Sequence, residues 1–106
     1  MTSIYQSIQE PSRNETVAVS TTSIVISDAK NLDNPRKVLL VRNISPNSTD
    51  TITVTLGNTP SVANAGIVLK QNESFVDTVD SGYTPWQGSV TAICATSTGS
   101  LAIFER

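Results

Sequence analysis

Few side chains in this sequence have the types and the spacing that catalysis requires. The sequence contains no histidine, which removes Ser–His and Cys–His nucleophile pairs, imidazole metal ligands and the usual general base near neutral pH. The single cysteine, Cys94, can form neither a disulfide within the chain nor, without histidine, a structural zinc site. It lies within an apolar run, where a free cysteine behaves as a small buried hydrophobe. We therefore expect a protein that is not an enzyme and that uses no cofactor and no metal.

Carboxylates are the remaining candidates for chemistry, at Glu73, Asp77 and Asp80. A pair of carboxylates can hydrolyse a glycosidic bond or bind calcium. Asp77 and Asp80 are three positions apart, however, so on one strand they point to opposite faces. We expect these residues to be solvated positions near the end of a strand.

Two aromatic residues, Tyr83 and Trp86, lie in a predicted loop over residues 80–87. Aromatic side chains in a loop can anchor a partner subunit or stack on a sugar ring. Alternatively, Trp86 folds back and caps one end of the domain, because the chain has few aromatic residues for its core. All three interpretations stay open, and we place Tyr83 and Trp86 among the candidate contact residues.

The charge balance argues against nucleic acid and membrane partners. Seven basic and nine acidic residues give a net charge of −2, without the basic stripe or polybasic cluster that such partners require. We expect no signal peptide and no membrane span, because the N-terminus lacks a basic and apolar leader and no apolar run is long enough. The lone cysteine favours intracellular assembly. Tripeptides of the glycosylation type begin at Asn14, Asn43, Asn47 and Asn72, and we interpret them as chance matches.

The composition predicts an all-β protein. Ser and Thr together number 28, and Val and Ile number 20 against 6 Leu. β-Branched residues pack well on a pleated sheet, whereas Ser and Asn favour turns over helices. With 106 residues the chain is long enough for one hydrophobic core. We therefore expect a single-domain antiparallel β-sandwich, jelly-roll-like, with eight or nine short strands.

Hydrophobic periodicity places these strands along the chain. Residues 51–56 alternate without error, so Ile52, Val54 and Leu56 face inward. Residues 38–41 are apolar on both faces, as expected of an interior strand covered on both sides. Residues 16–27 contain two short apolar runs whose change of parity indicates a bend that moves the chain from one sheet to the other. Further strands are predicted over residues 67–70, 74–79, 88–95 and 101–105.

The connections between the strands are predicted from their length. Residues 46–50 and 96–100 are short, so we expect two hairpins, the second of which is central to the domain. Residues 57–66 are too long for a hairpin, so we expect them to cross between the sheets. The sequence stops one residue after its last strand, which predicts that this strand is seated inside a sheet.

The N-terminal residues 1–15 are predicted to form an arm, and residues 16–106 the sandwich domain. Ile4, Tyr5 and Ile8 recur at helical spacing before Pro11. Exposure of these apolar side chains to water is unfavourable, so we expect the arm to become ordered against a neighbouring subunit. A disordered tail is the alternative. Ile4, Tyr5 and Ile8 are thus further candidate contact residues.

Residues 36–106 resemble small structural proteins of bacteriophage virions. The resemblance lies in turns and strand ends, namely Arg42-Asn43-Ile44-Ser45, Gly57, Gly66 to Leu69, Trp86-Gln87-Gly88 and Glu105. It implies a β-sandwich or jelly-roll subunit of the virion, assembled in the host cytoplasm, that acts as a capsid decoration, vertex (penton) or fibre-base protein. The implied partners are identical subunits in a cyclic oligomer and a major capsid or other virion protein. A carbohydrate-binding module that holds a glycan on Tyr83 and Trp86 is the alternative.

Overall fold

The computed structural model describes residues 12–31, 33–57 and 60–106. In this part of the chain the regular structure consists of eight strands and no helix, so it contains no helix of the length and hydrophobicity that a membrane crossing requires. The strands are β1 (Arg13–Val19), β2 (Ile24–Ser27), β3 (Val38–Asn43), β4 (Ile52–Leu56), β5 (Ile67–Leu69), β6 (Ser74–Thr78), β7 (Val90–Cys94) and β8 (Gly99–Glu105).

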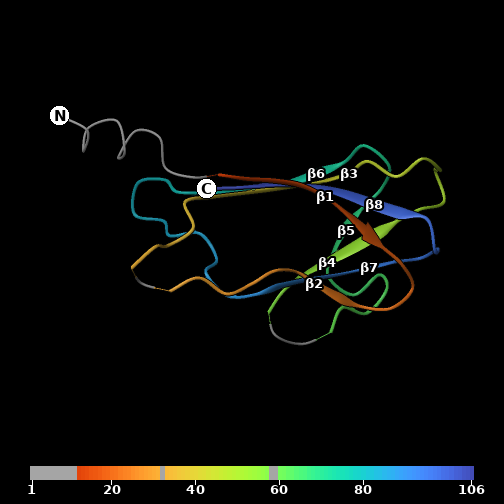
Figure 1. Cartoon of the computed structure of the whole chain (residues 1–106), viewed down its shortest axis with the longest axis horizontal. Helices are drawn as coiled ribbons and strands as arrows, with labels where there is room; N and C mark the ends of the chain where they lie inside the picture. Colours follow the sequence, from red (N-terminus) through yellow and green to blue (C-terminus); the bar gives the residue numbers. More distant parts are fainter. Residues whose placement is uncertain (1–11, 32, 58–59) are drawn as a thin grey trace.

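The strands form two four-stranded antiparallel sheets that pack face to face (Figure 1). Sheet A has the order β1-β8-β3-β6, and sheet B has the order β2-β7-β4-β5. β1 pairs with β8, β2 with β7, β3 with β6 and β4 with β5. This is the pairing of a long antiparallel hairpin that has been folded over into two sheets. This is the strand order of a jelly roll. The prediction of an all-β antiparallel sandwich with eight or nine short strands is confirmed.

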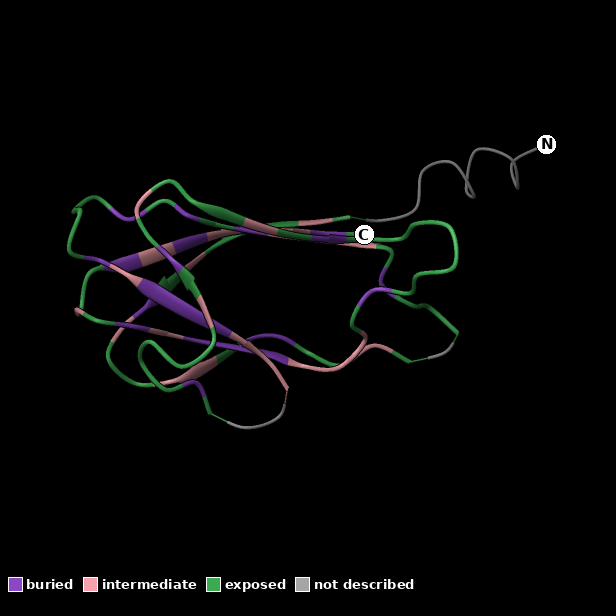
Figure 2. Ribbon diagram, turned by 180° about the vertical axis from the view of Figure 1, so that it is seen from behind, coloured by how far each residue is buried: buried purple, intermediate pink, exposed green. Residues whose placement is uncertain are grey.

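Alternation along the strands produces the core between the sheets (Figure 2). In β8, Leu101, Ile103 and Glu105 point inward, and in β4, Ile52 and Val54 do so, as predicted. The apolar core consists of Val19, Ile26, Leu39, Val41, Ile52, Val54, Leu69, Val90, Ala92, Cys94, Leu101 and Ile103. Cys94 is buried, as expected for a free cysteine in an apolar run.

The geometry of three strand connections was predicted from their length, and two of them were wrongly predicted to be hairpins. Residues 44–51 link β3 in sheet A to β4 in sheet B, and residues 95–98 link β7 in sheet B to β8 in sheet A. A few polar residues span the roughly 10 Å between packed sheets as easily as they reverse a strand within one sheet. The bend predicted between residues 16 and 27 does carry the chain from sheet A to sheet B, as expected.

The third connection, residues 57–66, joins two neighbouring strands of one sheet rather than crossing between sheets. It links β4 to β5 and is long because it lies over the outer face of sheet B. There Ser61 donates its hydroxyl to Thr55 at 2.9 Å, and the amide of Asn64 donates to the Thr53 hydroxyl at 2.9 Å. Thr53 therefore points outward, as predicted, but is buried.

The outer face of sheet A is different, because no described segment forms a layer over it (Figures 1 and 2). β3 is an interior strand of its sheet, as predicted, with β8 and β6 as neighbours. However, its outer side is not covered by any of the residues that the structure describes. Leu40, on its outer side, stays partly exposed, and the facing Val76 is 52% exposed.

The last strand is seated inside its sheet, as predicted. β8 lies between β1 and β3 and pairs with both over most of its length. β7 is likewise interior in sheet B, between β2 and β4. β1 begins at Arg13, inside the range 1–15 that we expected to form an arm, whereas residues 1–11 lie outside the described residues.

Candidate functional site

A loop of residues 80–88, here called the aromatic loop, is attached to the end of β6 by one carboxylate. Asp77 is buried at 5% exposure on the inner side of β6. One of its oxygens accepts the Tyr83 hydroxyl at 2.5 Å, and the other accepts the Trp86 amide at 2.9 Å. The hydrogen bond to Asp77 raises the pKa of Tyr83 above its usual range. Asp77 therefore fixes both aromatic residues in position.

Gln87 attaches the other end of the aromatic loop. Its side-chain oxygen accepts the Arg36 amide at 2.6 Å, and its side-chain nitrogen donates to the Arg36 carbonyl at 2.7 Å. The same nitrogen donates to the Pro85 carbonyl at 2.8 Å, and the Gln87 carbonyl accepts the amide of Lys30 at 2.7 Å. The Gln87 amide thus satisfies both the backbone N–H and the backbone C=O of Arg36, as the backbone of a neighbouring strand does in a sheet.

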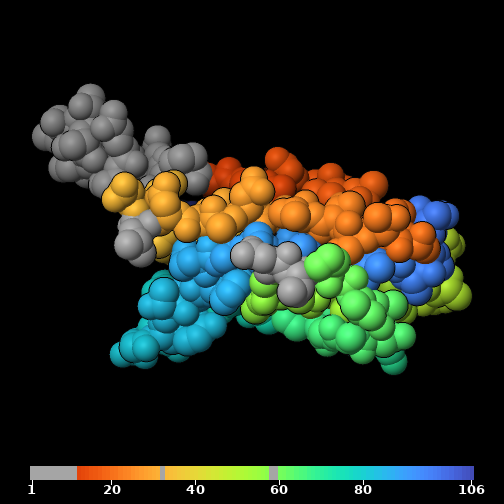
Figure 3. Space-filling model, turned by 90° about the horizontal axis from the view of Figure 1, so that it is seen from below, coloured from red at the N-terminus to blue at the C-terminus, as the bar shows by residue number. Residues whose placement is uncertain are grey.

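The aromatic side chains themselves stay on the surface. Tyr83 is 50% and Trp86 39% exposed, and neither belongs to the core. The Trp86 ring lies over Gly88, where an added β-carbon would come within 2.3 Å of a ring carbon. Trp86 thus folds back on its own loop without entering the core. In Figure 3 the cyan segment that contains the aromatic loop projects from the body of the molecule.

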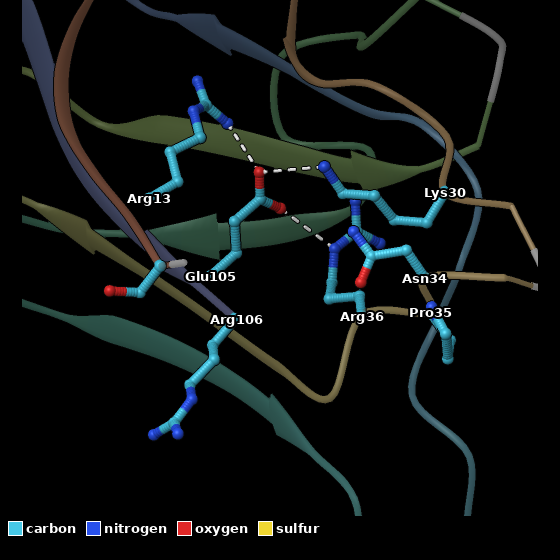
Figure 4. Close-up of a pocket in the computed structure, with 8 residues that line it drawn as sticks. Arg13, Lys30, Asn34, Pro35, Arg36, Glu105 and Arg106 are labelled. Atoms are coloured by element: carbon cyan, nitrogen blue, oxygen red, sulfur yellow. Dashed lines mark hydrogen bonds and ion pairs between the residues drawn. The ribbon is translucent and has the colours of Figure 1, made fainter. Parts of the chain in front are cut away.

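At the same end of the sandwich, Glu105 gathers three basic side chains (Figure 4). One carboxylate oxygen accepts Arg13 at 2.9 Å and Lys30 at 3.3 Å. The other accepts Arg36 at 3.0 Å and the Ser27 hydroxyl at 2.7 Å. Glu105 is 4% exposed and the Arg36 side chain is fully buried. The cluster therefore connects β8 of sheet A to β2 of sheet B.

The electrostatics of this cluster suit a structural role. Burial alone raises the pKa of Glu105, but the hydrogen bonds from Ser27, Arg13 and Arg36 outweigh burial and lower it to about 2. A carboxyl group with this pKa stays ionised near neutral pH, so it does not exchange protons as a general acid or base there.

Arg36 is held by several acceptors besides Glu105. Its guanidinium also donates to the carbonyls of Trp86, Gly88 and Asp28 and to the Ser27 hydroxyl. Beside the cluster lies an open pocket of about 270 Å³. Arg13, Lys30, Arg36 and Glu105 of the cluster line it, together with Asn34, Pro35 and Arg106. Figure 4 shows the Arg106 side chain directed away from the Glu105 carboxylate. The pocket wall therefore contains the ion-pair network of Arg13, Lys30, Arg36 and Glu105.

The opposite end of the sandwich is organised by Asn43. Its amide nitrogen donates to the carbonyls of Asp50 and Leu69 at 2.7 and 2.9 Å, and its oxygen accepts the Ser45 amide at 3.0 Å. The Asp50 carboxylate accepts the hydroxyl of Thr96, and this hydrogen bond lowers the pKa of Asp50. These contacts fix the crossing between β3 and β4.

The three candidate carboxylates do not form a site. Asp77 is buried and hydrogen-bonded, which corrects the expectation that it is solvated, whereas Glu73 and Asp80 are exposed. Glu73 accepts the Lys70 amide, and Asp80 accepts the Ser81 amide. Among residues 12–31, 33–57 and 60–106, no group of three acidic or cysteine side chains is arranged to hold a metal ion.

A shallow hollow of about 300 Å³ lies on the outer face of sheet A. Ala102 has the smallest side chain among the lining residues. Its neighbours in the sheet are Thr16 of β1 on one side and Arg42 of β3 on the other. Phe104 and Leu40, which face each other across β8 and β3, also line it. The row continues to Val76 on β6, which pairs with Leu40. The outer face thus combines an apolar row with a hollow.

The predicted contact residues fall in two places. Tyr83 and Trp86 lie together on the projecting aromatic loop, whereas Ile4, Tyr5 and Ile8 lie outside the described residues. Sequence reasoning missed the bond between Arg36 and Glu105 and the outer face of sheet A. The apolar residues on both faces of β3 were the only signal for that face.

No protein-family model matches this chain, and neither the curated proteins nor the solved structures contain a match. Four of the positions on which the expected resemblance to virion proteins depends have structural tasks in this fold. Asn43 fixes a crossing, Gln87 clamps Arg36, Gly88 makes room for Trp86, and Glu105 is the buried ion-pair acceptor. These four residues therefore form part of the framework of the fold.

Proposed function

We propose that this protein is a structural component of a bacteriophage virion that assembles as a homo-oligomer on the capsid, in a decoration, vertex (penton) or fibre-base role. It acts by packing against identical subunits and a major capsid or other virion protein, aided by its N-terminal arm. It is not an enzyme, and it needs no cofactor. It functions within the particle, which is assembled in the host cytoplasm.

The observation that supports this proposal is a difference between the outer faces of the two sheets. The chain covers the outer face of sheet B with its own residues 60–66, burying Thr53 and Thr91. On sheet A none of the described residues forms such a cover over the outer row of Phe104, Leu40 and Val76. An apolar row of this kind, flanked by polar residues on an outer sheet face, suits the binding of another molecule.

The fold supports the same proposal by analogy. Jelly rolls occur in viral capsid proteins, but also in lectins and in other families, so the strand order alone does not decide the function. The ion-pair network around Glu105 stays charged near neutral pH and ties the sheets together. A rigid sandwich of this kind suits repeated packing in a shell.

The proposal is tested on particles and in solution. Mass spectrometry of purified virions from the source phage is expected to detect the protein in many copies, and light scattering of the isolated protein is expected to give a symmetric oligomer. Absence from the particles together with a strictly monomeric protein would refute the proposal.

A carbohydrate-binding module is the second candidate, supported by the exposure of Tyr83 and Trp86 on a loop held by Asp77. Fixed aromatic side chains suit stacking on a sugar ring. A glycan array that shows binding by the native protein and its loss in Trp86→Ala, with an unchanged unfolding temperature, would favour this candidate over assembly.

A further inference from the structure

The hollow on the outer face of sheet A has an apolar floor of a size that suits one or two apolar side chains, beside the polar residues of β1 and Arg42 of β3. Its lining includes Leu40, Ala102 and Phe104, and its volume of about 300 Å³ gives room for side chains such as isoleucine or tyrosine. Its rim toward the sheet edge is polar and is formed by Asn14, Glu15 and Thr16 of β1. A floor at Ala102 between bulkier neighbours is suited to a protruding side chain from another segment.

The N-terminal residues 1–11 provide side chains of this kind. They include Ile4, Tyr5 and Ile8, and Glu10 is their only charged side chain. This segment is joined to β1 through Ser12, and β1 is the edge strand that borders the hollow. The segment therefore starts beside the kind of surface that it matches.

The direction of the connection favours the hollow of another copy. Arg13, the first residue of β1, is fixed by its bonds to Glu105 and to the Ile26 carbonyl at 2.9 Å each. Pro11 restricts the preceding Glu10 to extended backbone, so the sequence favours a chain that continues away from β1 without a reversal. A return to its own hollow requires a reversal immediately before β1, whereas a neighbour's hollow does not.

The segment is also long enough to reach a second molecule. Eleven extended residues span about 36 Å, whereas a sheet of four strands is about 15 Å wide. We propose that residues 1–11 of one copy lie on the outer face of sheet A of a neighbouring copy, with apolar side chains in the hollow over Ala102. This inference rests on the proposed function, because it names the contact by which copies associate.

Association of the full chain tests this seat. Ala102→Trp fills the hollow, and deletion of residues 1–11 removes the occupant, so each is expected to weaken self-association at least tenfold in sedimentation or light-scattering titrations. Val68→Trp, on the outer side of sheet B, is the matched control and is expected to associate normally. Thr16→Trp, at the rim of the hollow, replaces Ala102→Trp if that variant does not fold.

Cross-linking separates a neighbour's hollow from the chain's own. Cysteine is placed at Ile4, Tyr5 or Ile8 in one protein and at Ala102 in another, and the wild type, whose Cys94 is buried, is the control. Mixing the two proteins under mild oxidation is expected to give disulfide-linked dimers. A link that forms only within a chain carrying both cysteines, or no link from any of the three positions, would overturn the inference.

The two proposals fail in different ways. An oligomer that persists unchanged in Ala102→Trp and in the deletion variant overturns the seat and leaves the virion function standing. A full chain that is monomeric, forms no cross-link and is absent from particles overturns both.

Discussion

The Arg36 guanidinium and the Glu105 carboxylate, 69 positions apart in sequence, meet at 3.0 Å in the interior of the sandwich. Both side chains are almost completely withdrawn from solvent. A buried charge without a partner destabilises the folded state, so loss of either residue is expected to lower the free energy of unfolding. This pair joins the connection before β3 to the end of β8.

Glu105→Gln is therefore expected to destabilise the protein strongly. The substitution leaves the Arg36 guanidinium buried without a counter-charge, which costs about 3–5 kcal/mol in the free energy of unfolding. Urea unfolding at neutral pH measures this loss. The control is Glu15→Gln, which removes an exposed partner of Arg13 and should cost less than about 1 kcal/mol. Equal effects of the two substitutions would contradict this view of the cluster.

The stability should also fall in acid because of Glu105. Its pKa is about 2 in the folded protein against 4.5 normally, so the folded state binds the proton less well than the unfolded chain. The resulting contribution, about 3 kcal/mol, is fully present above pH 4.5 and is lost as the pH falls from there toward 2. The stability difference between wild type and Glu105→Gln should shrink over this range, and a constant difference would show that Glu105 is not the group responsible.

Tyr83 should ionise at unusually high pH because Asp77 accepts its hydroxyl proton. Absorbance at 295 nm in a Tyr5→Phe background follows Tyr83 alone, since the chain has two tyrosines. Asp77→Asn removes the negative charge and is expected to lower the midpoint toward the usual range, whereas Asp80→Asn, an exposed neighbour, should leave it nearly unchanged. An unaltered midpoint in Asp77→Asn would disprove the link.

Gly88→Ala tests the fit of the Trp86 ring against its own loop. The new methyl group meets the ring at 2.3 Å, so the ring must move, at a cost of about 1–3 kcal/mol and with a shift in tryptophan fluorescence. In a Trp86→Ala background the same substitution should cost less than about 1 kcal/mol, because the obstacle is gone. Additive costs in this double-mutant cycle would mean that ring and glycine do not touch.

Asn43→Ala is expected to destabilise the far end of the sandwich by about 2–4 kcal/mol. The carbonyls of Asp50 and Leu69 and the amide of Ser45 then lose their partner in a buried site. Thermal unfolding measures the loss. Asn47→Ala, which removes a long contact to Thr98 and a side-chain hydrogen bond to the Asp50 carboxylate, serves as the comparison and should cost less, about 1 kcal/mol.

Sequence patterns predicted the strands much better than their partners. The alternation of Ile52, Val54 and Leu56 shows which side chains face the core, because that depends only on a period of two. It does not show which sheet a strand joins, so the crossings at residues 44–51 and 95–98 were taken for hairpins. Both loops have lengths that fit either geometry.

The candidate site was predicted only where the signal is local. Tyr83 and Trp86 stand out as aromatic residues in a loop, and the structure does place them together on the surface. The anchors Asp77 and Gln87 act through contacts that no periodicity encodes, and the pairing of Arg36 with Glu105 depends on the whole topology. Long-range polar pairs of this kind are determined by the fold rather than by neighbours in sequence.

β8 lies between β1 and β3, so the hollow over Ala102 does not exist until the last strand of the chain has joined the first. Under the proposed contact, a chain whose β8 has not yet paired with β1 and β3 offers no receptor face to another copy. Association through the hollow then follows folding of the sandwich, so partly folded chains, which are the most prone to aggregate, do not meet through it.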